Sequence, residues 1–327
     1  MKHSYTAIVA RSFIAGLLLV GWGSATATSF PERTIQMVVG FPGGQSTDLA
    51  ARQIAKGMSD ILKESVIVLN QPGAGGGISH RTVKIAAPDG YTLVMGSTGT
   101  LAINPSLYSN LPYDPLEDFE PIVLATATPH VLFVSGKSPI NNLKELVAYA
   151  KANPGIVAYG SAGSGTTGHI AMELLKKETD IDMLHIPYKG SPAMVNGVIG
   201  GDVIVGFEPI STLIAMQESG LVKFLGIGTL TRHPGFPELT TLAEQGLPKL
   251  EVVPWTAILA PKGTPAPIIE KLNIVINEVL KDPELVAEYN RNGRSILGGS
   301  SSDAKNHLER EHARWAEAVK ISGSKVD

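Results

Sequence analysis

One segment, residues 156–178 (IVAYGSAGSGTTGHIAMELLKKE), constrains the fold of this 327-residue chain most strongly. Residues 156–159 form an apolar run that predicts a short strand, and a turn of Gly, Ser and Thr follows. Beyond the turn, Ile170, Leu174 and Leu175 have helical spacing. The first backbone N–H groups of such a helix are unpaired and lie at the positive end of its dipole. The segment therefore predicts an anion-binding turn at a helix start.

The chemistry of this turn leaves three interpretations: a nucleotide site, a plain tight turn, or a site for a small oxyanion such as a carboxylate. Its glycines allow close backbone approach and its hydroxyls add donors: Gly163, Gly165, Gly168, Ser161, Ser164, Thr166 and Thr167. A phosphate loop would need Lys where His169 stands and Ser or Thr where Ile170 stands. A dinucleotide site would need an acidic residue after the next strand, which instead runs into Tyr188 and Lys189. We favour the small oxyanion.

The N-terminal residues 1–27 are typical of a secretory signal peptide. Lys2 and Arg11 give a positively charged region before the apolar residues 13–20, and an Ala-Thr-Ala cleavage motif ends at Ala27. We therefore expect an exported, periplasmic protein that is cleaved near Ala27; an uncleaved membrane anchor is the alternative. The chain contains no Cys, which excludes disulfides and lipid attachment through Cys.

Composition narrows the function classes. The formal net charge is -3 and no basic block occurs, so we expect no nucleic-acid partner. The eight His residues are scattered without metal-ligand spacing, so we expect no metal and no cofactor. With 43% hydrophobic residues, the chain can bury the cores of two α/β domains.

Repeated strand, Gly-rich turn and helix units predict the domain organisation. Strands at residues 34–39 and 91–95 also end in loops of Gly, Ser and Thr, and ligands of open α/β sheets gather at such strand ends. Two extended segments that break near Pro129 predict one crossing between domains. A further extended segment at residues 252–260 predicts the return crossing. We expect a signal peptide (1–27), lobe 1 (28–128 and 253–327) and lobe 2 (129–252).

Several local features have a structural interpretation at this stage. Thr47 or Asp48 is expected to be the N-cap of a helix. The glycines of residues 70–80 are expected to allow close packing. His80 is expected to be solvated or to cap its helix. Lys189 is the only cation in the candidate loops. One stripe of the last helix is expected to pack in the core: Leu308, His312, Trp315 and Val319.

Six segments in this order resemble the Bug family of periplasmic solute receptors, the extracytoplasmic subunits of tripartite tricarboxylate transporters. The resemblance covers essentially all of residues 28–327. The segments are FPERTIQMVVGF with GGQSTD, NQPGAGGGI, DGYTLVMGSTGTLAINPSLY, YGSAGSGTTGH, IPYKGSPAM and WTAILAPKGTPAPII.

The resemblance implies a type II periplasmic binding protein fold: two α/β lobes, a two-crossing hinge and a ligand cleft between the lobes. It further implies a monomeric receptor without enzymatic activity that delivers a small carboxylate-containing ligand to an integral membrane permease. It places the ligand against the following residues: Phe41, Gly44, Gln45, Thr47, Asp48, Ser97, Thr98, Asn104, Ser161, Gly163, Ser164, Thr166, His169, Lys189, Gly190, Phe207 and Glu208.

Three residues depart from the family pattern. Gly40 stands where Pro is frequent, Gln45 where the second Gly of a Gly-Gly pair falls, and Glu208 where Asp is common. One hypothesis is that Gln45 supplies an amide to a ligand group that relatives leave to water.

The alternative function is an exported serine hydrolase that uses Ser161 or Ser164. Neither serine completes a G-x-S-x-G elbow, because Tyr159 and Ala162 occupy the first glycine positions.

Overall fold

The computed structural model describes residues 30–326, and the predicted signal peptide lies outside them. From Pro31 onward the chain forms one compact unit that contains two sheets. The six-stranded sheet has the order β11-β4-β10-β3-β1-β2, in which β1 is parallel to β2 and β3, while β10 runs antiparallel to β3 and β4. Its strands are β1 (Ile35–Val39), β2 (Val66–Asn70), β3 (Thr92–Ser97), β4 (Phe119–Ala127), β10 (Trp255–Pro261) and β11 (Ser295–Gly298).

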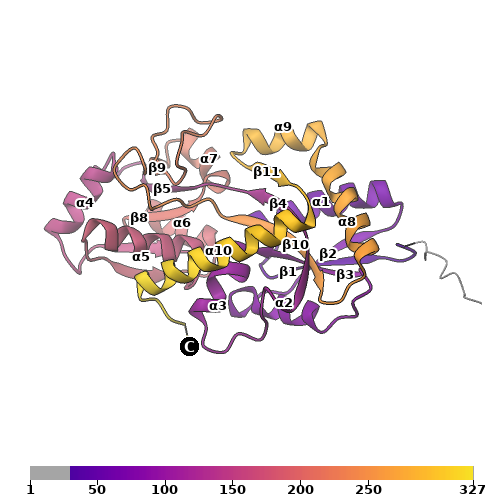
Figure 1. Cartoon of the computed structure of the whole chain (residues 1–327). Coiled ribbons are helices and arrows are strands. Elements are labelled where there is room, and N and C mark those ends of the chain that lie inside the picture. The colour runs from indigo at the N-terminus through magenta and orange to yellow at the C-terminus, as the bar shows by residue number, and fades with distance from the viewer. Residues whose placement is uncertain (1–29, 327) are drawn as a thin grey trace, which may run out of the picture. The chain divides into compact units, whose positions relative to one another are not determined.

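The five-stranded sheet has the order β7-β6-β8-β5-β9, with β6 parallel to β7 and β8. Its strands are β5 (His130–Ser135), β6 (Ala158–Ser161), β7 (Leu184–Pro187), β8 (Val205–Pro209) and β9 (Val222–Ile227). The chain enters this sheet between β4 and β5 and leaves it before β10, so the predicted break near Pro129 is confirmed. The result is the two-lobed α/β architecture that the resemblance implies, and Figure 1 shows the two sets of strands.

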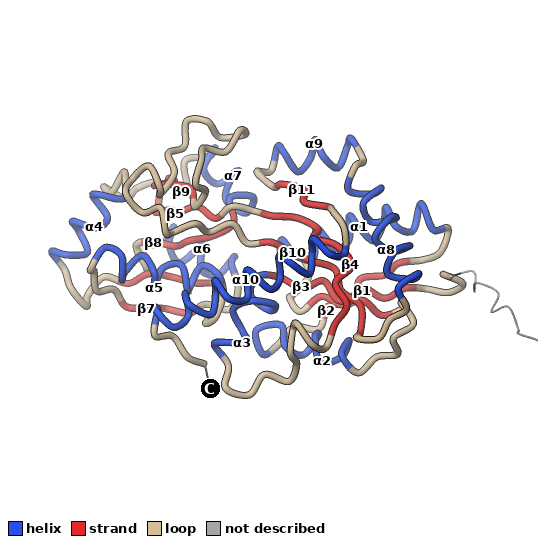
Figure 2. Tube along the Cα trace, in the orientation of Figure 1, coloured by secondary structure: helices blue, strands red, loops and turns tan. Residues whose placement is uncertain are grey.

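Helices cover both sheets, as Figure 2 shows. The longer ones are α1 (Ser46–Leu62), α2 (Gly77–Lys84), α4 (Leu143–Ala152), α5 (Thr167–Thr179), α6 (Ser191–Gly200), α7 (Ile210–Glu218), α8 (Ala266–Leu280), α9 (Pro283–Arg291) and α10 (Ser301–Ser322). Short turns of helix are η1 (Ala74–Gly76), η2 (Gly99–Ile103) and α3 (Asn104–Leu107). None of the helices within residues 30–326 combines the length and apolar character that crossing a membrane requires.

The C-terminal helix α10 packs on both lobes. It contacts β4 and η2 beside the six-stranded sheet and α5 beside the five-stranded sheet, and Figure 1 shows it running along both. Leu308, Trp315 and Val319 are buried, as expected from the stripe. His312 is only partly buried, and the neighbouring Glu311 takes the buried position.

Glu311 is buried because it receives hydrogen bonds on both oxygens. Its Oε2 accepts from Trp255 Nε1 at 3.0 Å and from Trp315 Nε1 at 3.1 Å, while Arg314 donates to Oε1 at 3.1 Å. Although burial acts to raise the pKa of Glu311, Arg314 and the Trp255 hydrogen bond lower it overall. This carboxylate therefore ties α10 to the first residue of β10, at the crossing between the lobes.

His80 is not the solvated or capping residue expected from the sequence, because it is fully buried. Its ring stacks on Tyr113 with centroids 4.7 Å apart, and its Nδ1 lies 3.1 Å from the Gly76 carbonyl oxygen. The glycine-rich segment packs closely as expected: a Cβ at Gly40 would lie 2.7 Å from the Gly76 Cα.

Burial of His80 predicts acid sensitivity. Burial lowers its pKa from 6.5 to about 4, against the opposing Gly76 hydrogen bond. The unfolded chain therefore binds the proton first as the pH falls, so the contribution of His80 to stability is complete above pH 6.5 and is lost progressively toward pH 4. We expect the free energy of unfolding to fall in this window by about 1.4 kcal/mol per pH unit for His80.

Urea unfolding at pH 5, 6 and 7 tests this expectation. In the His80→Asn variant, the free energy of unfolding should depend less steeply on pH, because unfolding takes up one proton fewer. This expectation holds whatever the stability of the variant at pH 7. An identical pH dependence in the variant would show that His80 does not titrate in this range.

Candidate functional site

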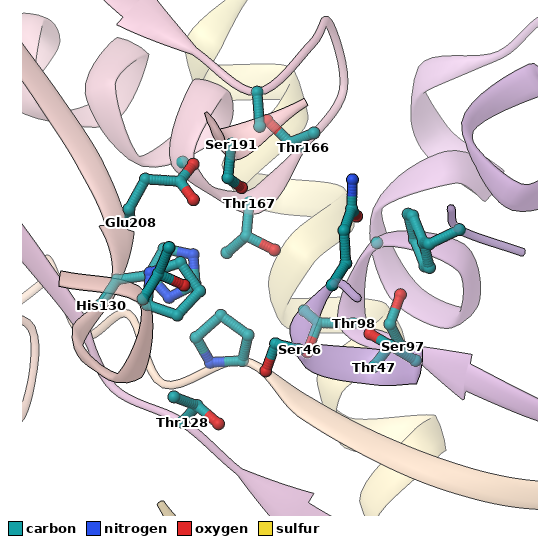
Figure 3. A pocket seen from close by; sticks show the side chains of 18 of the residues that line it. Ser46, Thr47, Ser97, Thr98, Thr128, His130, Thr166, Thr167, Ser191 and Glu208 are labelled. Atoms are coloured by element: carbon teal, nitrogen blue, oxygen red, sulfur yellow. The ribbon is translucent and has the colours of Figure 1, made fainter. Parts of the chain in front are cut away.

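The candidate site is a cleft of about 290 Å³ where loops of both lobes meet. It is lined by residues that follow β1, β3, β6 and β8 and by the crossing segments next to β4, β5 and β10 (Figure 3). The carboxyl ends of parallel strands from both sheets therefore open into one cleft. Its polar lining residues include Gln45, Ser46, Thr47, Ser97, Thr98, Asn104, Thr126, Thr128, His130, Ser164, Thr166, Thr167, Ser191, Glu208, Ser211, Thr212, Thr256 and Arg294.

Four helices begin at this cleft. The first residues of α1, α5, α6 and α7, or the residues just before them, line it. Within residues 30–326, none of these four starts has a side-chain capping hydrogen bond. Helices α2 and α8 have none either, whereas Asn142, Asp282 and Ser300 cap α4, α9 and α10. The first-turn N–H groups at the cleft are thus left for a ligand, and the dipoles favour a negative one. This arrangement can bind a carboxylate without a cation.

The turn before α5 is held in place by its glycines and by His169. Gly163 and Gly165 have φ of 140° and 82°, which side chains rarely adopt. The Gly165 N–H donates to His169 Nδ1 at 3.1 Å, so His169 shapes the turn from behind and does not line the cleft. Gly168 lies so close to β8 that a Cβ would be 2.2 Å from the Phe207 carbonyl oxygen.

The structure brings many of the expected site residues together. The cleft is lined by Phe41, Gly44, Gln45, Thr47, Ser97, Thr98, Asn104, Ser164, Thr166 and Glu208. The other expected residues do not line it: Asp48, Ser161, Gly163, His169, Lys189, Gly190 and Phe207.

Asp48 stabilises the loop before α1. The expected N-cap role of Thr47 or Asp48 is wrong, since Gln45 occupies that position and the helix starts at Ser46. Asp48 is buried and accepts hydrogen bonds from the Gly44 N–H at 2.7 Å, from Arg52 and from Asn70. Burial acts to raise its pKa, but these hydrogen bonds lower it overall, so Asp48 is an ionised support for the Gly44 turn.

Ser161 has a histidine partner that the sequence analysis did not identify. His185 Nε2 lies 2.7 Å from Ser161 Oγ, and the His185 ring stacks between Tyr159 and His169, with centroids 4.9 and 4.0 Å away. Ser161 is 1% exposed, its Oγ donates to the Gly163 carbonyl at 3.1 Å, and it does not line the cleft. Ser164 lines the cleft. The Ser161–His185 pair thus supports the turn and has no route to a substrate in the cleft.

Glu208 and His130 place titratable groups in the cleft on the side of the five-stranded sheet (Figure 3). Glu208 is 3% exposed, and burial raises its pKa to about 7, with a hydrogen bond from Ser191 acting in the opposite direction. Burial lowers the pKa of His130 to about 3, so its ring is neutral. Glu208 Oε2 has no hydrogen-bond partner among residues 30–326.

Arg294 is the only Lys or Arg among the described residues that line the cleft, and it was not predicted from the sequence. Lys189, the cation expected near the ligand, is exposed and does not line the cleft. Arg294 precedes β11, and the pairing of Ser295 with Ala127 places it beside the crossing at Thr128. Only this long-range pairing identifies it, because the local sequence around Arg294 carries no loop signature. Within residues 30–326 no group of three or more acidic or His side chains has the arrangement of a metal site.

Comparison with known proteins identifies the class. Residues 50–323 match the TctC model, the tripartite tricarboxylate transporter family receptor. The chain is 35% identical over 317 residues to protein BugT of Bordetella pertussis, covering 96% of this chain and 97% of that protein. This chain belongs to the TctC family of solute-binding receptors, which includes the Bug proteins.

Solved structures agree with the fold. The R. palustris protein Rpa4515 with adipate is 32% identical, with a TM-score of 0.86, and covers 91% of this chain and 100% of that chain. MatC of Rhodopseudomonas palustris with bound malate is 30% identical, with a TM-score of 0.82, and covers 89% of this chain and 100% of that chain. The two-lobed periplasmic binding protein fold is therefore the fold of this chain.

Proposed function

We infer that this protein is a periplasmic receptor that captures a small carboxylate-containing ligand in its cleft and delivers it to the membrane permease of a tripartite tricarboxylate transporter. The observation that carries this inference is the convergence of four uncapped helix starts on one cleft. Two relatives of this fold are solved with adipate and with malate, both of which are dicarboxylates.

The mechanism needs binding and closure, and no chemical step. Backbone N–H groups and hydroxyls from both lobes contact one ligand, so the ligand stabilises the closed arrangement, which the permease then recognises. With lobe boundaries proposed near residues 128 and 253, the proposed hinge is at the two crossings, where Thr128 and Pro254 line the cleft. A function without catalysis also fits the Ser161 hydroxyl, which lies behind the turn and away from the cleft.

Thermal unfolding of the purified protein against mono-, di- and tricarboxylates, amino acids and aromatic acids tests the receptor function. A ligand at 100 times its dissociation constant stabilises the fold by about 2.7 kcal/mol, which corresponds to an increase in Tm on the order of 5 °C. We expect such a shift with one carboxylate class and no turnover of the bound compound.

A matched pair of variants on α1 tests whether the ligand-induced increase in Tm comes from binding in the cleft. Thr47→Trp places a large side chain in the cleft and should abolish the shift, whereas Lys56→Trp, at an exposed position of the same helix, should keep it. The absence of a shift with every carboxylate, or turnover of one, would refute the receptor function.

A further inference from the structure

Two side chains of opposite charge line the cleft without pairing. Glu208 belongs to β8 and Arg294 precedes β11, so they come from different sheets. They are 3% and 7% exposed, and neither takes part in an ion pair within residues 30–326. Among residues 30–326, Glu208 Oε2 and Arg294 Nε are buried without a hydrogen-bond partner, although Ser191 forms a hydrogen bond with the Glu208 carboxyl and Tyr289 forms one with the Arg294 side chain. Burying charged groups that are only partly paired costs free energy, so their further partners are expected to enter with the ligand.

The Glu208 side of the cleft is suited to a group that donates hydrogen bonds. The carboxyl of Glu208 points into the cleft near Ser191, and His130 lines the same side (Figure 3). An ionised carboxylate only accepts hydrogen bonds, and a neutral imidazole or a hydroxyl can also accept one. Burial raises the pKa of Glu208 to about 7, and a nearby positive charge would restore its ionised form. An ammonium group supplies both the charge and several donors.

Arg294 is suited to a carboxylate. The guanidinium lies 5.5 Å from the centroid of the Tyr289 ring, which is itself 1% exposed and therefore a fixed support. A planar guanidinium binds a carboxylate through two parallel hydrogen bonds. Arg294 is therefore suited to a negative group of the ligand, whereas Glu208 is suited to a positive one.

We propose that the ligand of this cleft is a small amino carboxylic acid, whose ammonium group binds at Glu208 and whose carboxylate binds at Arg294. This proposal rests on the proposed receptor function and narrows its substrate class. The uncapped helix starts can bind a further carboxylate, so an amino dicarboxylic acid has a group for Glu208, for Arg294 and for a helix start. The cleft volume of about 290 Å³ restricts the ligand to a small molecule.

Calorimetric titration with matched compounds tests the proposal on the unmodified protein. Succinate, malate and aspartate share one carbon skeleton and differ by a hydrogen, a hydroxyl or an ammonium group; glutarate with glutamate and adipate with 2-aminoadipate extend the comparison. We expect the amino compound of one skeleton to bind at least about tenfold more tightly than its partner without the amino group. Equal or tighter binding of the plain dicarboxylates would overturn the proposal and leave the receptor function intact. No binding by any of these compounds would also overturn the proposal, and the wider panel of carboxylates would then decide the receptor function separately.

Two variants assign the preference to the named residues. Glu208→Gln keeps the shape and removes the charge, so it should lower affinity for the amino compound about tenfold or more while leaving the plain dicarboxylate unaffected or bound more tightly. Arg294→Gln should lower the affinity for both compounds. Glu218→Gln, at the exposed end of α7, is the control and should change neither. A Glu208→Gln variant that folds and keeps the full preference would refute the role of Glu208.

Discussion

Replacing Trp315 by Ala is expected to lower the free energy of unfolding by about 3–5 kcal/mol, the range for removing a large buried aromatic side chain. Trp315 is 2% exposed and belongs to the core cluster that joins α10 to buried residues of both lobes. Its loss leaves a cavity but no unpaired charge, because Glu311 still accepts from Trp255 and Arg314. The predicted cost is therefore mainly lost packing. It corresponds to a decrease in Tm on the order of 10 °C for a chain of this length.

Urea unfolding of three variants separates packing from hydrogen bonding. Trp315→Phe keeps most of the bulk and loses the Nε1 donor to Glu311, so it should cost much less than Trp315→Ala. Ile321→Ala changes an apolar residue of the same helix that is 39% exposed, and its cost should stay within about 0.5 kcal/mol. If Trp315→Ala lowers the free energy of unfolding as little as Ile321→Ala does, then α10 does not hold the core of the two lobes together.

Most of the fold could be predicted from the sequence because it depends on local patterns. The strand and helix around the anion-binding turn were expected at residues 156–178 and lie at Ala158–Ser161 and Thr167–Thr179. The final helix was expected from its apolar stripe and spans Ser301–Ser322, where a Ser300 and Asp303 capping box begins it. Helix α7 (Ile210–Glu218) was missed, because its sequence, ISTLIAMQE, has no capping residue and only weak apolar periodicity.

The site could be predicted only where its residues follow a strand in a recognisable loop. Gln45, Ser97 and Thr166 are such residues, and all three line the cleft. Arg294 lines it for a different reason, since only the pairing of β11 with the distant β4 places it beside the crossing at Thr128. No local pattern encodes that pairing, so the position of Arg294 in the cleft could not be predicted from the sequence.

Replacing Gly168 by Ala is expected to disrupt the anion-binding turn. In a helix, Ala is favoured over Gly by about 0.5–1 kcal/mol, so helix propensity alone predicts a gain in stability. The packing predicts the opposite, since the new Cβ would lie 2.2 Å from the Phe207 carbonyl oxygen. Phe207 is paired with Leu132 in the neighbouring strand and cannot shift alone, so the start of α5 must move. We expect a loss of about 1–3 kcal/mol, the range for overpacking a core.

The same displacement should also remove ligand binding, because Thr166, Thr167 and Gly168 line the cleft at the start of α5. Gly200→Ala provides the matched control: Gly200 ends α6, and a Cβ there has no atom within 4 Å. That variant should gain up to about 1 kcal/mol and bind as the parent does. Urea unfolding and calorimetric titration of both variants give the comparison. If Gly168→Ala matches Gly200→Ala in stability and affinity, then the close contact between α5 and β8 does not position the donors of the cleft, and the carboxylate must bind elsewhere.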